Sequence, residues 1–243
     1  PELLREGDAE LFRRYQARAK GRVRYMTVAP EVPGVLDMLG EIRGECTLAI
    51  GHSDADYETA VRAIDAGVES CTHTFNVMSL FHQHRPAVMG AVLESDVFCE
   101  AICDGRHLHP GTVRMLLKCK GWDRVVAITD SMQAAGLPDG EYMLGVNRVT
   151  VTDGDAMISG TSIRAGSTLT LAQAVKKISA FTMAPPERVL PLLTLNPAKL
   201  IGEEHRRGEI AVGRDADFTV LSPELDVLAT WSAGENIYAA AKE

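Results

Sequence analysis

Short apolar runs alternate with amphipathic stretches along the first half of the chain. Five of these runs have the length and composition of β-strands, and their starts lie roughly 23 to 29 residues apart, about the length of a βα unit. The predicted strands are 23–28, 47–50, 70–72, 97–102 and 125–128. Because repeated βα units place their strands side by side in one direction, this half predicts a parallel sheet, open or closed.

The stretch between the second and third predicted strands has a helical period. In residues 57–67, Tyr57, Val61 and Ile64 fall on one face of a helix. Gly67 is a typical residue for a helix end, and Asp54 is a candidate N-cap.

The pattern changes after residue 131. Residues 141–157 predict short β-hairpins, with turn signals that include Asp153-Gly154. Helical patterns return further along the chain and are followed by short strand-like runs. The predicted helices are 168–179, 186–193 and 197–201, and the predicted strands are 209–212, 218–221 and 227–230.

Composition narrows the class of protein. Hydrophobic residues make up 46% of the 243 residues, enough to form a core, and the net charge of −8 argues against general nucleic-acid binding. No apolar run approaches the ~18 residues of a membrane span. The five cysteines are odd in number and lie mostly in apolar runs, which favours a reducing compartment, and we expect a cytoplasmic protein.

Functional side chains follow each of the five predicted strands. Taken alone, each of these side chains, Asp130 included, could be an ordinary solvated or packed loop residue. Because the carboxyl ends of parallel strands lie on one face, the set is expected to converge. Carboxylate and imidazole groups together are the ligands of a hydrolytic divalent metal with an open position for water. The segments are Ala29-Pro30-Glu31, Gly51-His52-Ser53, Thr72-His73-Thr74, Asp104-Gly105-Arg106-His107 and Thr129-Asp130.

The order of these segments resembles the N-acetylglucosamine-6-phosphate deacetylase family of the amidohydrolase superfamily. The Thr-His-x-Phe-Asn segment at 72–76 is the most specific part, and the resemblance covers nearly the whole chain. Further matching segments are His107-Leu108-His109-Pro110, Arg164-Ala165-Gly166-Ser167, Thr194-Leu195-Asn196-Pro197-Ala198 and 208–218, the last being shared by much of the superfamily.

The resemblance implies a fold and a reaction. The fold is a (β/α)8 TIM-type barrel with a small β-sandwich built from both chain termini, so we expect residues 1–205 to belong to the barrel and 206–243 to the sandwich. The reaction is metal-dependent hydrolysis of the acetamide of N-acetylglucosamine 6-phosphate to glucosamine 6-phosphate and acetate. Zinc is the expected metal, with iron or another divalent ion as the alternative, and a homodimer is expected.

The resemblance also implies roles for individual residues. Glu31, His52 and His73 would hold the metal, Asp130 would be the acid/base, and the remaining residues would contact substrate. His107 is expected near the scissile amide, and Asn76 and Val77 near the sugar phosphate. His84 and Arg85 stand where the family has a phosphate-contacting arginine. Gly166 and Ser167 suit contacts around the acetyl group, with an ordinary turn as the alternative.

Two alternatives stay open at this point. The first is another amidohydrolase that acts on a cyclic amide or a nucleobase, against which the Ala-Pro-Glu and Thr-His-x-Phe-Asn segments argue. The second is a catalytically silent chain. It follows from the expectation that the family's early barrel strands are missing, because the first residues match a point beyond them.

Overall fold

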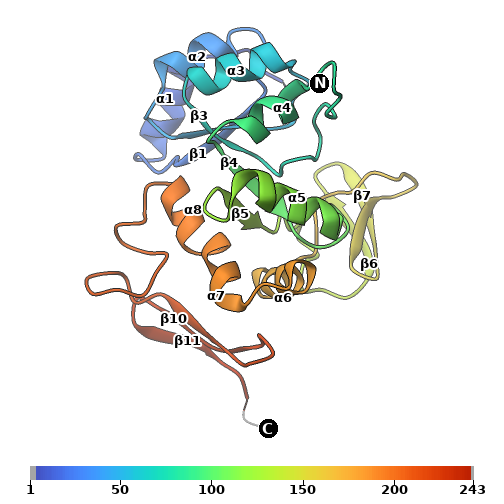
Figure 1. Ribbon diagram of the computed structural model, residues 1–243, viewed down its shortest axis with the longest axis vertical. Coiled ribbons are helices and arrows are strands. Elements are labelled where there is room, and N and C mark those ends of the chain that lie inside the picture. Colours follow the sequence, from blue (N-terminus) through green and yellow to red (C-terminus); the bar gives the residue numbers. More distant parts are fainter. Residues whose placement is uncertain (1–3, 242–243) are drawn as a thin grey trace. The chain divides into compact units, whose positions relative to one another are not determined.

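The computed structural model describes residues 4–241, and Figure 1 shows its elements. The predicted βα alternation is present, and the five predicted strands of the first half all form. The helices are α1 (Ala9–Arg18), α2 (Val35–Glu41), α3 (Tyr57–Asp65), α4 (Ala87–Glu94), α5 (Pro110–Lys120), α6 (Leu171–Thr182), α7 (Pro186–Val189), the 3-10 helix η1 (Leu190–Leu192) and α8 (Leu195–Leu200). The strands are β1 (Tyr25–Val28), β2 (Thr47–Ile50), β3 (Val68–Cys71), β4 (Phe98–Ile102), β5 (Val125–Ile128), β6 (Gly140–Leu144), β7 (Asn147–Thr152), β8 (Asp155–Ile158), β9 (Phe218–Leu221), β10 (Val227–Ser232) and β11 (Glu235–Ala239).

The chain divides into two compact units. The first comprises the chain up to Glu100 with Leu116–Val126 and Asn196–Glu204. The second comprises Ala101–Met115, Ala127–Leu195 and the chain from His205. The predicted division into a barrel domain, residues 1–205, and a sandwich segment, residues 206–243, stays a prediction. Residues 1–3, 242 and 243 lie outside the described residues.

The first unit is built on a sheet whose strand order is β1-β2-β3-β4-β5. The pairs β1–β2, β2–β3 and β3–β4 are parallel, so successive βα units add strands in chain order. The helices α1 to α4 contact one another in sequence and lie together beside the strands (Figure 1). All four residues of β2 are buried, and Leu48, Ile50, Leu39 and Ile42 are fully enclosed, which fixes the core between sheet and helices.

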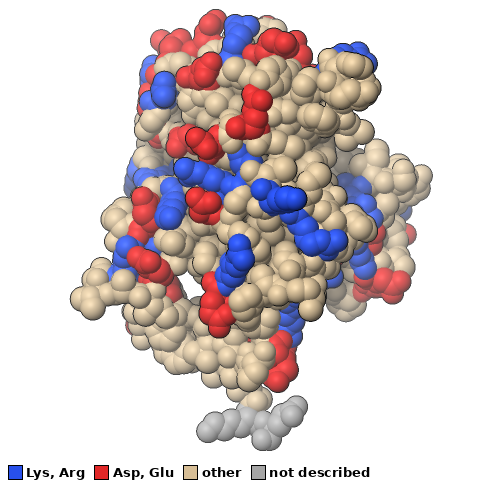
Figure 2. Space-filling model, in the orientation of Figure 1, with Lys and Arg blue, Asp and Glu red and all other residues tan. Residues whose placement is uncertain are grey.

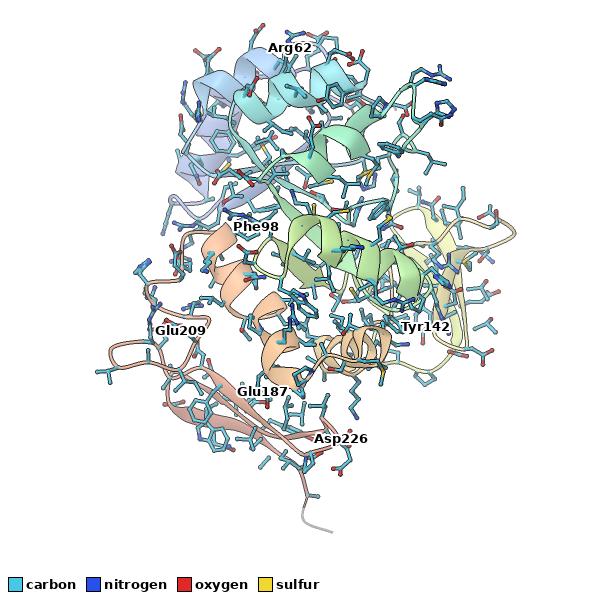
Figure 3. The ribbon with its side chains drawn as sticks, in the orientation of Figure 1. Arg62, Phe98, Tyr142, Glu187, Glu209 and Asp226 are labelled. Atoms are coloured by element: carbon cyan, nitrogen blue, oxygen red, sulfur yellow. The ribbon has the colours of Figure 1, made fainter. Side chains whose placement is uncertain are left out.

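Three contacts in the first unit involve the segment that enters β5. The Cys99 amide donates to the Arg124 carbonyl at 2.8 Å, which joins β4 to the segment entering β5. The Arg124 guanidinium lies 5.0 Å from the ring centre of Phe98, labelled in Figure 3. Asn196, from the predicted Asn-Pro motif, donates its side-chain amide to the Trp122 and Val125 carbonyls at 2.7 Å, so that motif has a structural role.

The second unit contains two antiparallel sheets. The predicted hairpins of residues 141–157 form a sheet of order β6-β7-β8 around a small apolar core, against which Tyr142 packs (Figure 3). Asp153 and Gly154 both have positive φ, 52° and 73°, as expected for the tight turn between β7 and β8. The sheet near the chain end has the order β11-β10-β9, with Phe218 stacked on Trp231 at 4.8 Å.

Two local predictions are wrong. The predicted strand 209–212 does not form: a turn closed by the Arg214 amide and the Ala211 carbonyl interrupts it, and Ile210 and Val212 remain almost fully exposed. The N-cap of α3 is Asp56, whose carboxylate accepts from the Thr59 amide at 2.8 Å. Asp54, two residues earlier, instead accepts a hydrogen bond from the Ser79 hydroxyl.

Acidic and basic side chains are interspersed on the face seen in Figure 2. Within residues 4–241, every helix is too short or too polar to cross a bilayer.

Candidate functional site

Two predicted metal ligands meet in the first unit. His52 follows β2 and His73 follows β3, each two residues beyond the last strand residue. Their Nε2 atoms lie 2.9 Å apart, with ring centres 4.7 Å apart and ring planes inclined by 70°. His73 is buried, and Glu100 of β4 supports its backbone, since the Glu100 side chain accepts from the His73 amide at 3.2 Å. The parallel strand order therefore brings the two imidazoles together, as the sequence predicts.

The third predicted ligand, Glu31, is held by the segment that follows β2. The Ser53 hydroxyl donates to Oε2 of Glu31 and the Asp54 amide donates to Oε1, both at 2.7 Å. These bonds fix the carboxylate beside the residue that follows His52. A carboxylate has about four lone-pair directions, so one hydrogen bond on each oxygen leaves acceptor capacity for a cation.

The nitrogen and oxygen donors of His52, His73 and Glu31 are of the kinds that bind a divalent metal. Two imidazole nitrogens facing one another can share at most one proton, and a cation accepts both lone pairs. His73 Nδ1 is buried without a hydrogen-bond partner, the kind of orphaned atom that a bound ion or water satisfies. Within the part of the chain that the structure describes, no three His, Cys, Asp or Glu side chains are grouped as a complete metal centre. The assignment of Glu31, His52 and His73 as joint ligands is therefore a proposal.

The backbone is strained where the functional side chains leave the strands. His52 has a φ of 50° and His73 a φ of 29°, and Asp130 in the second unit has a φ of 48°. Asp130 also stands two residues beyond its strand, β5. The left-handed region is uncommon for non-glycine residues and is concentrated at functional sites, so this shared geometry supports the choice of these positions.

The segment after His73 carries two predicted substrate contacts. Asn76 turns its side-chain amide back to the His73 and Thr74 carbonyls at 3.0 and 3.3 Å, which shapes the loop. Val77 is mostly exposed and has a φ of 49°, a costly conformation for a β-branched residue. The loop therefore exposes an apolar side chain next to an asparagine whose amide is hydrogen-bonded within the same loop.

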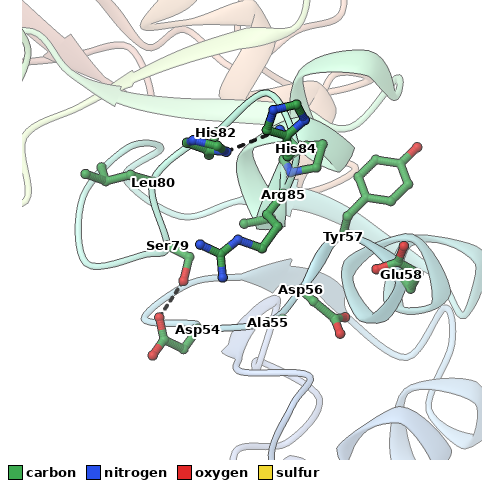
Figure 4. A pocket seen from close by; sticks show the side chains of 12 residues that line it. Asp54, Ala55, Asp56, Tyr57, Glu58, Ser79, Leu80, His82, His84 and Arg85 are labelled. Atoms are coloured by element: carbon green, nitrogen blue, oxygen red, sulfur yellow. Dashed lines mark hydrogen bonds between the residues drawn. The ribbon is translucent and has the colours of Figure 1, made fainter.

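His84 and Arg85 line a pocket of about 470 Å³ in the first unit, shown in Figure 4. His82, which the sequence reasoning did not single out, lines the same pocket, and its ring centre lies 5.5 Å from that of His84. Three acidic side chains line the pocket as well: Asp54, Asp56 and Glu58. The pocket can therefore present both cationic and anionic groups to a ligand.

His107 is held by a residue to which the sequence analysis gave no role. Its Nδ1 lies 2.6 Å from Oδ2 of Asp104, and both side chains are about nine-tenths buried. Oδ1 of Asp104 accepts from the Arg106 and His107 amides at 2.8 and 2.7 Å. Burial opposes ionisation of Asp104, but these hydrogen bonds outweigh it and the pKa of Asp104 is lowered.

The segment around Gly166 lies beside Asp130 in the second unit. The Ser167 amide donates to the Asp130 carbonyl and the Met132 amide donates to the Ser167 carbonyl, both at 2.8 Å. The Ser167 hydroxyl bonds to the Thr129 carbonyl and accepts from the Leu169 amide at 3.0 Å. Because Ser167 is buried and its hydroxyl is engaged inside the protein, the segment is a support for Asp130. Its contact with substrate stays a prediction.

One of the two supporting residues, Asp104, could have been found from spacing. Asp104 stands two residues after β4, the same offset as His52, His73 and Asp130 from their strands. Ser53 directly follows His52, but nothing in the sequence indicated that its hydroxyl would hold Glu31.

A family model described as "Amidohydrolase family" matches residues 13–237. The chain belongs to the amidohydrolase family. N-acetylglucosamine-6-phosphate deacetylase from Bacillus subtilis (strain 168) is 36% identical over 244 residues, covering 100% of this chain and 61% of that protein. N-acetylgalactosamine-6-phosphate deacetylase from Escherichia coli O157:H7 is 31% identical, covering 97% of this chain and 62% of that protein. This amidohydrolase chain thus spans about three fifths of the length of both relatives.

A solved structure shows the same architecture. The chain superimposes on a mutant N-acetyl-D-glucosamine-6-phosphate deacetylase from Mycobacterium smegmatis, in complex with N-acetyl-D-glucosamine-6-phosphate, with a TM-score of 0.91 and 35% identity. The match covers 97% of this amidohydrolase chain and 63% of that one. The predicted α/β fold class, a TIM-type barrel of the amidohydrolase superfamily with a small β-sheet segment at the C-terminal end, is confirmed.

Proposed function

We propose that the protein hydrolyses the acetamide of N-acetylglucosamine 6-phosphate to glucosamine 6-phosphate and acetate, using a divalent metal ion. One observation carries the proposal: the paired His52 and His73 lie within a similarity to deacetylases of this sugar phosphate that extends over the whole chain. The amidohydrolase family supplies the reaction class, and the named relatives supply the substrate class.

Glu31, His52 and His73 would hold the metal. Their nitrogen and oxygen donors suit zinc best, with iron or another divalent ion as the alternative. When bound, such an ion supplies Lewis-acid activation of water and of the amide carbonyl. The protein's own contribution at this point is to fix the donors, through Ser53 on Glu31 and Glu100 on the His73 backbone.

Asp130 would move the proton. As general base its carboxylate accepts a proton from the attacking water, and as general acid it returns that proton to the departing amine nitrogen. The second transfer is needed because an unprotonated amine is a poor leaving group. The bonds from Ser167 to the Asp130 and Thr129 carbonyls hold the backbone that presents this carboxylate.

The remaining predicted residues would recognise the substrate. His107 would contact the reacting amide, and Gly166 and Ser167 would shape the space for the acetyl group. Asn76, Val77, His84 and Arg85 would face the phosphate, and the guanidinium of Arg85 in the Figure 4 pocket would supply positive charge for it. We also propose that the protein is cytoplasmic, because of its cysteine composition, and that it forms a homodimer, because of the family resemblance.

A second candidate substrate is N-acetylgalactosamine 6-phosphate. A deacetylase named for that sugar is 31% identical and covers nearly all of this chain. The two sugars differ only at C4, and the acetamide chemistry is the same for both, so the same residues would act on either.

An acetate-release assay on the purified full chain tests the proposal. We expect turnover of N-acetylglucosamine 6-phosphate, loss of activity with a chelator and recovery with zinc. Parallel assays use N-acetylgalactosamine 6-phosphate, unphosphorylated N-acetylglucosamine and a cyclic amide. Faster turnover of N-acetylgalactosamine 6-phosphate would make that sugar the preferred substrate. Preferential turnover of the cyclic amide would assign the protein to a different reaction. No turnover of any substrate at full metal loading would overturn the proposal.

A further inference from the structure

The Asp104–His107 pair is a buried hydrogen-bonded arrangement in the second unit, and it includes neither the predicted metal ligands nor Asp130. The two side chains come from the turn after β4, and their short contact is about nine-tenths shielded from solvent. A buried carboxylate against an imidazole is costly unless both groups are hydrogen-bonded, and here each has a partner.

The two oxygens of Asp104 have different partners. Oδ1 accepts from two backbone amides, those of Arg106 and His107, while the hydrogen-bond partner of Oδ2 among residues 4–241 is His107 Nδ1. An ionised carboxylate accepts hydrogen bonds and donates none, so Nδ1 of His107 must carry a proton. The lowered pKa of Asp104, produced by these hydrogen bonds against the opposing effect of burial, agrees with an ionised carboxylate at neutral pH.

We infer that Asp104 is a positioning residue that fixes the tautomer and ring orientation of His107, with the proton on Nδ1 and Nε2 left to meet the substrate. The part of this inference that concerns substrate rests on the proposed function. Neutral His107 then presents a lone pair at Nε2. Protonated His107 presents an N–H at Nε2, and its charge is balanced by Asp104.

A purely structural role is the competing explanation. The bonds from Oδ1 to the two amides form a turn that would exist whether or not His107 were functional. Under that explanation only Oδ1 matters, and the tautomer of His107 is incidental. The two explanations differ in what they expect when Oδ2 alone is changed.

Asp104→Asn changes Oδ2 and keeps Oδ1. Two backbone N–H donors face Oδ1, so the amide oxygen of asparagine must stay there and its NH₂ group must face His107. An NH₂ group only donates, so Nδ1 becomes the acceptor and the proton of neutral His107 moves to Nε2. The variant should keep the turn and invert the tautomer, which reverses the polarity of the hydrogen bond that Nε2 offers.

Nitrogen-15 NMR of the histidine side chains measures the tautomer without any activity assay. The His107 signal is assigned by its loss in His107→Ala, and spectra are taken at a pH where the ring is neutral. We expect the Nδ1–H tautomer in the wild type and the Nε2–H tautomer in Asp104→Asn. Asp153→Asn is the matched control, because Asp153 lines the same small pocket as Asp104, Arg106 and Lys177, and should leave the tautomer unchanged.

Kinetics on the same proteins connect the tautomer to function. Asp104→Asn should lower kcat/KM by about 10- to 100-fold, the range known for carboxylates that orient metal-bound histidines and taken here for a substrate-facing one. In a His107→Ala background the same change should have no further effect. Asp153→Asn should stay within a few-fold of wild type.

Each outcome decides a separate point. A wild-type Nε2–H tautomer, or no change of tautomer in Asp104→Asn, overturns the inference whatever the enzyme does. Additive losses in the double variant restrict Asp104 to the structural role. A wild-type chain with the expected tautomer and no deacetylase activity overturns the proposed function and leaves the positioning of His107 by Asp104 standing.

Discussion

The amide nitrogen of Ser167 lies 2.8 Å from the carbonyl oxygen of Asp130. Gly166, the residue before Ser167, has a φ of 72°, and a Cβ atom built on it would lie 2.8 Å from the same oxygen. The proposed acid/base is therefore held by a neighbouring segment that approaches closely only because residue 166 has no side chain.

Gly166→Ala should displace Asp130. The added methyl group cannot share space with the Asp130 carbonyl, and misplacing a reacting group by about 1 Å can cost roughly 10²-fold in rate. We expect a comparable loss of kcat with the metal content unchanged. Gly136→Ala is the control, because Gly136 also has a positive φ, 79°, but has open space where its Cβ would be.

The left-handed backbone should cost both variants about 1–2 kcal/mol of unfolding free energy. Only Gly166→Ala should also lose activity. Equal kcat losses in the two variants would show that backbone strain, and not the approach to Asp130, explains the effect.

Asp130→Asn should retain the metal and lose about 10²–10⁴-fold in turnover, because the amide cannot accept the water proton. Asp123→Asn is matched to it, since Asp123 precedes β5 and Asp130 follows it. Single-turnover acetate release and metal analysis are measured on both. A turnover within a few-fold of wild type for Asp130→Asn would mean that Asp130 is an ordinary solvated residue at a strand end.

The double variant His52→Ala/His73→Ala should lose tightly bound metal. Removing both imidazoles leaves Glu31 as a single carboxylate ligand, too few for a site that needs three protein ligands. Metal is measured by mass spectrometry after dialysis. The control, His109→Ala/His205→Ala, removes the same number of imidazoles from residues outside the predicted ligand set. Retention of about one equivalent by the first variant contradicts the ligand assignment.

Asp104→Asn should lower stability in a pH-dependent way. The pKa of Asp104 is lowered in the folded protein from an ordinary value of 3.8, so its ionised form stabilises the fold above that value. The stabilisation is lost as the pH falls through the lowered folded pKa. We expect a difference of about 1–3 kcal/mol in unfolding free energy at pH 7, typical of hydrogen bonds to a charged group. The difference should shrink below pH ~4. Denaturant titrations at several pH values check this, and a difference that does not change with pH argues against an ionised Asp104.

The sequence predicts those parts of the fold that depend on local pattern. The five strands of the first half and the hairpins of residues 141–157 follow from apolar runs and turn residues, and both are confirmed. The run 209–212 misleads because Ile210 and Val212 alternate like strand residues but find no partner strand, so a turn forms instead. Apolar alternation indicates a strand only where another strand supplies hydrogen bonds.

The candidate site is predictable where it depends on the order of the strands. The parallel topology brings His52 and His73 together, as expected from their places after successive strands. The residues that hold the functional groups are harder to find, because the bonds from Asp104 to His107 and from Ser53 to Glu31 depend on local side-chain geometry. Such geometry depends on turns whose conformation the apolar pattern does not specify. The experiments above test the roles of Glu31, His107 and Asp130.

The positive φ of His52 and His73 has a consequence for laboratory evolution. Each such residue costs of the order of 1–3 kcal/mol, and glycine adopts the same conformation without that penalty. A library selected only for heat resistance should therefore accumulate glycine or asparagine at these two positions, and the recovered proteins would be more stable but would lack two of the proposed metal ligands. A thermostable form of this protein has to be selected for turnover and heat resistance together.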